Sequence, residues 1–397
     1  MTSRVAVFGA TRADLFPLAP VLRALAAAPE LDVTLLASGT IGNPEFGDPV
    51  ADLDLTGVTV EAVAGGLGAS DYRAQTDGGA RIAEAVGAAL DRLRPAACVV
   101  LGDRWELLYA VPAMVLLGVP LVHLHGGEVT EGAVDDRVRH AVSKLADLHC
   151  VSTERAAARL RQLGEPADRV VVTGAPALDQ VAAVAAADDT RLAAILGRPL
   201  VRPLALVTYH PVTADGPDPG AGAADVLAAV AATTGSAIVT HPGLDRGREA
   251  VLGAIAAATS TWPQLVEVGS LGADYLPVLA AADVVVGNSS SGIFEAATFG
   301  VPVVNVGDRQ RGRVSGANVL DAADDRAAVE AAIRTTLEPA FREQARAAVN
   351  VYGDGHAAPR IVDVVRRAVA GGLARKPFVD LACADLDDRA VRAESPS

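Results

Sequence analysis

Short apolar runs alternate along this chain with longer stretches in which apolar residues recur every three or four positions. In the first half the runs fall at residues 5–8, 33–36, 97–101, 121–123 and 170–173. Apolar runs of this length, separated by helical spacing, are typical of buried parallel strands joined by helices. The pattern therefore predicts an α/β protein with a doubly wound parallel sheet.

The same pattern restarts in the second half of the chain, where apolar runs fall at residues 204–207, 237–240, 265–268, 284–286 and 303–306. We expect two Rossmann-like domains that face a cleft, one over residues 1–180 and one over residues 200–355. The segment between them reads as helix or linker. A last helix at residues 356–370 is expected to complete the first domain, and residues 375–397 are expected to form a loose tail.

Composition narrows the class of protein. At 397 residues and 51% hydrophobic content, the chain is long enough for two cores. No apolar run reaches the roughly 18 residues of a membrane helix, and the chain enters a strand without space for a signal peptide, so we expect a cytoplasmic protein. Cys98, Cys150 and Cys383 are too far apart to predict a disulfide framework or a structural zinc site. The net charge of −14 disfavours a nucleic-acid partner, so any bound anion must be held by local groups.

The largest concentration of histidines and carboxylates follows the strand at 121–123. His123 and His125 lie two residues apart at its carboxyl end and are predicted to face one side, where open α/β sheets bind ligands. In the helix that follows, three- and four-residue spacing places polar side chains next to one another on one face; they are Asp135, Asp136, Arg139, His140 and Ser143. Two interpretations stay open: a metal site built on the two histidines and nearby carboxylates, and a structural role for single histidines, as expected for His149 and His356.

Two more strand ends in the first half carry charged residues. The turn after the first strand leads from Gly9 through Arg12 into a helix, which points backbone N–H groups at any bound phosphate. Asp103, Arg104 and Glu106 follow the strand ending at Leu101 and stand either in the crevice or in a surface salt bridge. The glycines at 65–68 follow no strand of the right spacing and are set aside.

The second half supplies candidate groups for an anion. Residues 286–295 are predicted to form the end of a strand, a turn of small residues and the start of a helix. This turn either binds a phosphate or is a serine N-cap with no ligand, and Glu295 could accept hydrogen bonds from ribose hydroxyls. His210 ends another strand and would project into the cleft opposite the acids. Arg309, Arg311 and Arg313 concentrate positive charge in an acidic chain, which suits a pyrophosphate.

Five motifs together resemble the hydrolysing UDP-N-acetylglucosamine 2-epimerases of the sialic or legionaminic acid pathway type. The motifs are TRAD at 11–14, GDRWE at 102–106, the segment HLHGGEVTEGAVDDRVRHAVSKLADLH at 123–149, GNSSSGIFE at 287–295 and NVGDRQRGRVSGANVL at 305–320. The resemblance spans about residues 4–370, and non-hydrolysing epimerases are more distant because they lack the HxHGGE form. It implies the glycosyltransferase-B-type fold, a nucleotide-sugar substrate and a homodimer or higher homo-oligomer.

The resemblance also implies a reaction. UDP is eliminated to leave a 2-acetamidoglucal, and water then adds to give free N-acetylmannosamine, with neither a metal nor another cofactor. A base and an acid are needed, and the candidates, which stay unassigned, are Asp103, Glu128, Asp135 and Asp136, with His125, Arg139 and His210 as further catalytic groups. The expected nucleotide and diphosphate contacts are Arg12, Arg104, His241, Ser289, Ser290, Ser291, Gly292, Glu295, Arg309 and Arg313.

Two positions depart from the family pattern. Ile41 stands where a histidine is usual, and Gly243 replaces an asparagine, so two polar groups are missing. These changes raise a second hypothesis, in which the substrate carries a modified sugar, such as a 4-amino-4,6-dideoxy derivative used for a legionaminic-type acid, or a different nucleotide. A glycosyltransferase of the same fold and a non-catalytic nucleotide-sugar sensor are two further candidate functions.

Overall fold

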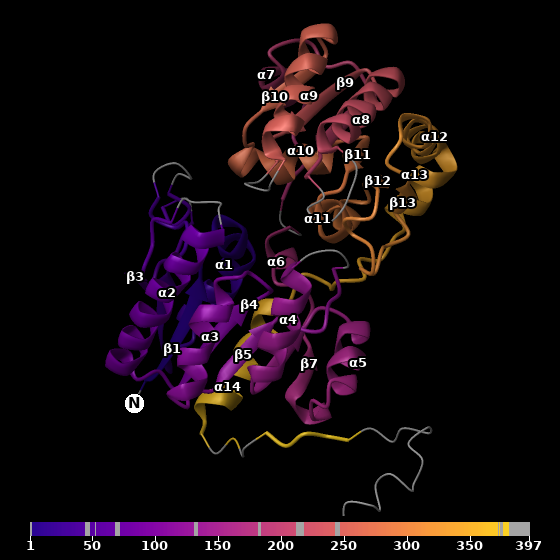
Figure 1. The fold of residues 1–397 in the computed structure, drawn as a ribbon. Coiled ribbons are helices and arrows are strands. Elements are labelled where there is room, and N and C mark those ends of the chain that lie inside the picture. Colours follow the sequence, from indigo (N-terminus) through magenta and orange to yellow (C-terminus); the bar gives the residue numbers. More distant parts are fainter. Residues whose placement is uncertain are drawn as a thin grey trace, which may run out of the picture.

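Two parallel sheets, each covered by helices, form the computed structural model, which describes residues 2–43, 48–51, 53–67, 72–130, 134–181, 184–211, 218–242, 247–371, 373 and 376–380. Figure 1 shows them as two lobes, the first indigo to magenta and the second mainly red to orange. The predicted fold class of two parallel-sheet α/β domains is confirmed.

The first sheet has seven strands in the order β3-β2-β1-β4-β5-β6-β7, and every neighbouring pair is parallel. Its central strands read as continuous apolar runs because helices cover both faces. The strands are β1 (Ser3–Gly9), β2 (Leu31–Ala37), β3 (Val58–Ala62), β4 (Ala97–Leu101), β5 (Leu121–Leu124), β6 (Leu148–Val151) and β7 (Val170–Val172). The helices are α1 (Arg12–Ala26), α2 (Tyr72–Leu93), α3 (Leu107–Leu116), α4 (Val134–Leu145), α5 (Glu154–Gln162) and the short η2 (Ala167–Arg169) and α6 (Leu178–Val181).

The second sheet repeats the plan with six parallel strands in the order β10-β9-β8-β11-β12-β13. The strands are β8 (Leu204–Thr208), β9 (Ser236–Thr240), β10 (Leu265–Val268), β11 (Val284–Gly287), β12 (Val303–Val306) and β13 (Val319–Ala322). The helices are α7 (Asp189–Leu196), α8 (Pro219–Thr233), α9 (Arg248–Thr261), η3 (Gly272–Asp274), α10 (Tyr275–Ala281), α11 (Ser290–Phe294), η4 (Ala296–Phe299), α12 (Arg326–Leu337) and α13 (Pro339–Arg346).

Three strands went unrecognised in the sequence. β3 and β13 are the outermost strands on one side of their sheets, and their residues are mostly half-buried or exposed, so they lack a continuous apolar run. β6 is fully buried, but it carries His149 and follows α4 closely, so its four residues read as the end of the histidine-rich motif.

The chain crosses between the lobes twice, once between β7 and α7 and once after α13. After the second crossing, α14 (Ala357–Val369) returns to the first lobe, where Ile361, Val362 and Val365 join the core around α1 and β1. Figure 1 shows this helix in yellow within the indigo and magenta lobe. Residues 376–380, part of the expected loose tail, lie against α4 and the turn after α5: Lys376 donates to the Ala146 carbonyl, and Val379 donates to the Gly164 carbonyl.

Candidate functional site

Both sheets reverse their strand order between the first and fourth strands, at β1/β4 in one and β8/β11 in the other. Helices leave such a switch point toward opposite faces, which opens a crevice at the carboxyl ends of the strands. The loops at these ends are residues 10–11 and 102–106 in the first lobe, and 209–211 and 288–289 in the second. Four of the predicted site residues, Asp103, Arg104, His210 and Ser289, lie in these loops.

Arg139 is the centre of a polar network on the first lobe. Only 1% of the residue is exposed, and its guanidinium forms an ion pair with Asp103. It also donates to the Glu128 carbonyl at 3.0 Å and to the Thr130 hydroxyl at 3.1 Å. Burial, with nearby Arg313, lowers the pKa of Arg139 to about 9, so the group stays charged at neutral pH. Arg139 thus holds the Asp103 carboxylate in place, and both of its Nη groups are engaged within the protein.

His125 and Glu128 form the closest acid–base pair of this network. His125 Nδ1 lies 2.6 Å from Glu128 Oε1, and the Ser152 hydroxyl donates to the same oxygen at 2.7 Å. Burial would raise the pKa of Glu128, but His125, Arg313 and the Ser152 hydrogen bond outweigh it and lower the pKa to about 2. The carboxylate is therefore ionised and orients the imidazole beside it.

The prediction that His123 and His125 face one side is wrong. β5 ends at Leu124, and His125 adopts a left-handed backbone with φ 61°, which breaks the two-residue alternation of the strand. His123 is fully buried and bonds the Gly102 carbonyl at 2.8 Å and the Ser143 hydroxyl at 3.2 Å, and burial lowers its pKa to about 3. Across the described part of the chain, no group of three His, Cys, Asp or Glu residues could hold a metal ion.

The two acids at the start of α4 have different surroundings. Asp136 accepts the Thr130 N–H at 2.8 Å and lies 3.6 Å from His140 Nε2, so it braces the loop that carries Glu128. Asp135 is half-buried in the first turn and lies within electrostatic reach of Arg104. Asp136 therefore belongs to the network around Glu128.

Arg104 is shared by two carboxylates at the β1/β4 switch point. Its guanidinium lies 3.3 Å from Glu106, and it also acts electrostatically on Asp14, whose carboxylate accepts the Ala10 N–H at 3.1 Å. Burial raises the pKa of both carboxyls despite Arg104. Glu106 is 1% exposed, so the interpretation as a surface salt bridge is wrong. Arg12, by contrast, is exposed at the start of α1.

Asn288 joins three segments of the second lobe. Its amide bonds both backbone groups of His210, accepting the N–H at 2.7 Å and donating to the carbonyl at 2.9 Å. Its own carbonyl accepts from Arg309 at 3.0 Å and Gln310 at 2.8 Å. Sequence reasoning missed Asn288; an amide directly after a buried strand and before three serines was the available signal.

The serine-rich turn after β11 is a capped helix start. The Ser289 hydroxyl accepts the Ser291 N–H at 3.4 Å, and the Ser291 hydroxyl bonds the Tyr275 hydroxyl. Ser290 begins α11. A Cβ on Gly292 would lie 3.0 Å from the Val303 side chain, so glycine allows α11 to pack closely on β12.

Glu295 follows this turn and is held in its neutral form. Burial raises its pKa to about 8, although Ser291 and Arg313 act in the opposite direction. Its Oε2 is buried and has no hydrogen-bond partner among the described residues. At neutral pH the carboxyl is therefore mostly protonated and can donate as well as accept.

Arg313 lies between the two lobes. Its Nη2 approaches the Thr130 hydroxyl of the first lobe at 3.5 Å, and its guanidinium lies 5.1 Å from the centre of the Phe294 ring. Nε and Nη1 are buried and have no hydrogen-bond partner among the described residues. The structure therefore brings a cation with open donors to the acid network of the first lobe. Arg311, by contrast, is exposed beside Asp308.

The sequence also singled out His241, Gly243 and Ile41. His241 follows β9 and bonds Glu267 at 2.6 Å. Gly243 lies outside the described residues. Ile41 is 6% exposed and packs in the core around β1 and β2, so its apolar side chain is accommodated by packing.

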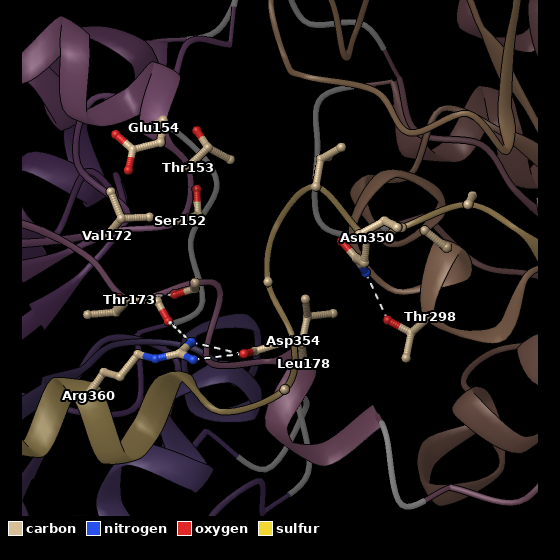
Figure 2. A pocket seen from close by; sticks show the side chains of 17 residues that line it. Ser152, Thr153, Glu154, Val172, Thr173, Leu178, Thr298, Asn350, Asp354 and Arg360 are labelled. Carbon is tan, nitrogen blue, oxygen red and sulfur yellow. Dashed lines mark hydrogen bonds and ion pairs between the residues drawn. The ribbon is translucent and has the colours of Figure 1, made fainter.

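A cavity of about 600 Å³ lies behind the Glu128 network, between the two lobes. Figure 2 shows Ser152 and Thr153 on one side, Thr298 and Asn350 on the other, and the Arg360–Asp354 ion pair below. None of the predicted site residues is among its described lining residues. The cavity meets the candidate site at Ser152, whose hydroxyl binds Glu128.

Together these features define a two-domain α/β protein. An acid–base network on its first lobe faces Arg313 and the serine-rich turn of the second lobe, an arrangement suited to a polar ligand with an anionic group. The chain belongs to the UDP-N-acetylglucosamine 2-epimerase family, which matches residues 23–366. The membership predicted from the motifs is confirmed.

Relatives support the assignment along most of the chain. The GDP/UDP-N,N'-diacetylbacillosamine 2-epimerase (hydrolyzing) of Campylobacter jejuni is 31% identical over 80% of this chain and 84% of its own. The UDP-N,N'-diacetylbacillosamine 2-epimerase (hydrolyzing) of Legionella pneumophila is 30% identical over 92% and 96%. The structure of the Neisseria meningitidis UDP-GlcNAc 2-epimerase bound to UDP-GlcNAc covers 92% of this chain and 100% of its own at a TM-score of 0.77 and 18% identity, which confirms the glycosyltransferase-B-type fold alone. No helix of the described residues is long and apolar enough to span a membrane.

Proposed function

We propose that this protein is a hydrolysing 2-epimerase, which converts a UDP-activated 2-acetamido sugar into UDP and the free sugar inverted at carbon 2. The observation that carries the proposal is the position of Arg313. Its open donors lie beside Thr130 and within electrostatic reach of Glu128, so a diphosphate bound there would sit next to the His125–Glu128 pair. Family membership supports the same chemistry.

In the proposed first step, the His125–Glu128 pair takes the proton from carbon 2. The bond from carbon 1 to the diphosphate oxygen breaks as the double bond between carbons 1 and 2 forms. His125 Nδ1 faces Glu128, so Nε2 is the atom left for proton transfer. Because the two groups are 2.6 Å apart and share a hydrogen bond, we assign the role to the pair.

Hydration completes the proposed reaction. Water adds its hydroxyl to carbon 1, and a proton returns to carbon 2 on the opposite face, which inverts this centre. Asp103, fixed by Arg139, is placed to accept from a sugar hydroxyl. Arg313 neutralises the charge of the departing diphosphate, and the protonated Glu295 is assigned to the ribose.

The relatives bear on the sugar. Two that cover most of the chain are named for N,N'-diacetylbacillosamine, a sugar of the modified type that the departures at Ile41 and Gly243 suggested. The Neisseria meningitidis relative named UDP-N-acetylglucosamine 2-epimerase matches 58% of the chain, at 32% identity. We therefore propose UDP-N,N'-diacetylbacillosamine as the first substrate and UDP-N-acetylglucosamine as the second.

The test is proton NMR of the purified protein in deuterated water with each nucleotide sugar. We expect free sugar with deuterium at carbon 2, and a kcat/KM at least about ten-fold higher for the diacetylbacillosamine substrate. The opposite preference would overturn the choice of sugar. Release of UDP only when an acceptor sugar is present would indicate a glycosyltransferase, and binding without any UDP release would indicate a sensor.

A further inference from the structure

Tyr352 lies on the second crossing between the lobes, at a point where both crossings meet. Its carbonyl accepts the Ala175 N–H of the first crossing at 2.7 Å. A Cβ on Gly353 would lie 3.1 Å from the Cα of Gly174, so the two crossings touch there without side chains between them. Tyr352 is 2% exposed and is therefore fixed at the joint of the two lobes.

The side chain of Tyr352 reaches from this joint toward Arg313. Its hydroxyl donates to the carbonyl of Val314, the residue after Arg313, at 2.8 Å. Its ring packs on Phe294 with centroids 4.1 Å apart. Phe294 in turn lies under the Arg313 guanidinium at 5.1 Å. Tyr352 thus supports Arg313 in two ways, through the backbone beside it and through the ring beneath it.

Phe294 also links this support to the first lobe. Its ring meets the His125 ring edge-on at 5.9 Å, and its carbonyl accepts from Asn350, two residues before Tyr352, at 2.7 Å. Figure 2 shows Asn350 also bonded to Thr298 at the wall of the cavity. Movement of the second crossing would therefore shift the support of both Arg313 and His125.

We propose that Tyr352 is a positioning residue, which acts through Phe294 and Val314 to hold Arg313 against the diphosphate of the bound nucleotide. This inference rests on the proposed function. It predicts that Tyr352 affects binding of a nucleoside diphosphate far more than binding of the monophosphate, because only the former has the second phosphate. If Tyr352 had only a structural role, its replacement would weaken the binding of both ligands equally.

Calorimetric titration of the full-length protein with UDP and with UMP tests the proposal. We expect Tyr352→Phe to raise the Kd for UDP about three- to ten-fold, as for loss of one buried hydrogen bond, and to leave the Kd for UMP within about two-fold. In an Arg313→Gln background the same change should have no further effect on UDP. Phe294→Leu, which keeps apolar bulk but removes the ring, should reproduce the UDP-selective loss.

Thr336→Val is the matched control, because it also removes a buried hydroxyl that donates to a backbone carbonyl, here that of Ile333 at 2.9 Å on α12 of the second lobe. It should leave both Kd values unchanged. Equal weakening of UDP and UMP by Tyr352→Phe, or an undiminished effect in the Arg313→Gln background, would overturn the inference while leaving the proposed function intact. A wild-type protein that binds no UDP would overturn both.

Discussion

Two histidine–glutamate pairs lie in the first lobe, one just after β5 and one on β6, and they differ in what surrounds them. His125 and Glu128 follow β5, with Nδ1 and Oε1 2.6 Å apart, and their side chains are 14% and 8% exposed. His149 in β6 lies 2.9 Å from Glu165, and both side chains are fully buried. The same two residue types therefore build one pair at the cleft and one inside the lobe.

The partners of the glutamates separate the two pairs. Glu165 forms ion pairs with two lysines, Lys144 at 2.8 Å and Lys376 at 2.7 Å, so its charge is neutralised within the lobe. Glu128 accepts from Ser152 and faces Arg313 of the other lobe, which keeps donors open. We infer that the neighbours of a pair, and not the pair itself, mark the functional site.

The pKa values alone do not distinguish these pairs. Burial would raise the pKa of either glutamate, but hydrogen bonds and nearby positive groups lower both to about 2. Perturbed pKa values are common at functional sites, but structural ion-pair networks also produce them. Matched substitutions in the two pairs can separate the roles.

The largest effect is expected from Glu128→Gln. It keeps a side chain of the same shape beside His125 but removes the charge, so we expect kcat to fall by about 10³-fold, or about 4 kcal/mol in the barrier. Steady-state turnover of the preferred nucleotide sugar measures this loss. The melting temperature should change little, and a variant that retains more than about a tenth of the wild-type kcat would remove the pair from the reaction.

The same substitution in the other pair, Glu165→Gln, should have the opposite profile. It leaves Lys144 and Lys376 without their buried counter-charge, so we expect the free energy of unfolding to fall by about 3 kcal/mol. Urea unfolding measures this change. The kcat per folded molecule should equal that of wild type, and a selective loss of kcat would show that our distinction between the pairs is wrong.

The central strands and the site loops were predictable because both follow local rules. Buried parallel strands are continuous apolar runs, and ligands gather at their carboxyl ends, which placed Asp103, Glu128 and His210 near the cleft. Their partners were not predictable. Arg139 reaches Asp103 across 36 positions of sequence, and Ser152 reaches Glu128 across 24, so these contacts depend on how helices and strands pack.

Predictions from local sequence patterns failed where the backbone leaves regular secondary structure and where distant residues make contact. The two-residue alternation of a strand misplaced His123 and His125, because the strand ends between them. Composition suggested a loose tail, but Lys376 finds a buried carboxylate and Phe378 lies under Lys144 at 4.3 Å. Such docking depends on an acceptor, Glu165, that lies far earlier in the chain.

The smallest expected effect concerns His149 and the pH dependence of stability. Burial lowers the pKa of His149 in the folded protein, so below about pH 6.5 the unfolded chain binds a proton here that the folded chain does not. Stability must therefore fall as the pH falls, by at most about 1.4 kcal/mol per pH unit for this group. Glu165 contributes in the same direction only below about pH 4.5, where the unfolded carboxyl protonates. Between pH 7 and pH 5, carboxyls with a raised pKa, Glu295 above all, contribute in the opposite direction, so the difference between wild type and a His149 variant isolates this histidine.

Replacement of His149 by glutamine sharpens this measurement. His149→Gln keeps a donor for Glu165 but cannot titrate, so its stability should fall less steeply with acidification than that of wild type. His356→Gln, at an exposed histidine, should retain the wild-type slope. If His149→Gln and wild type lose stability in parallel, His149 does not stay neutral in the folded protein. That result would contradict the lowered pKa of His149.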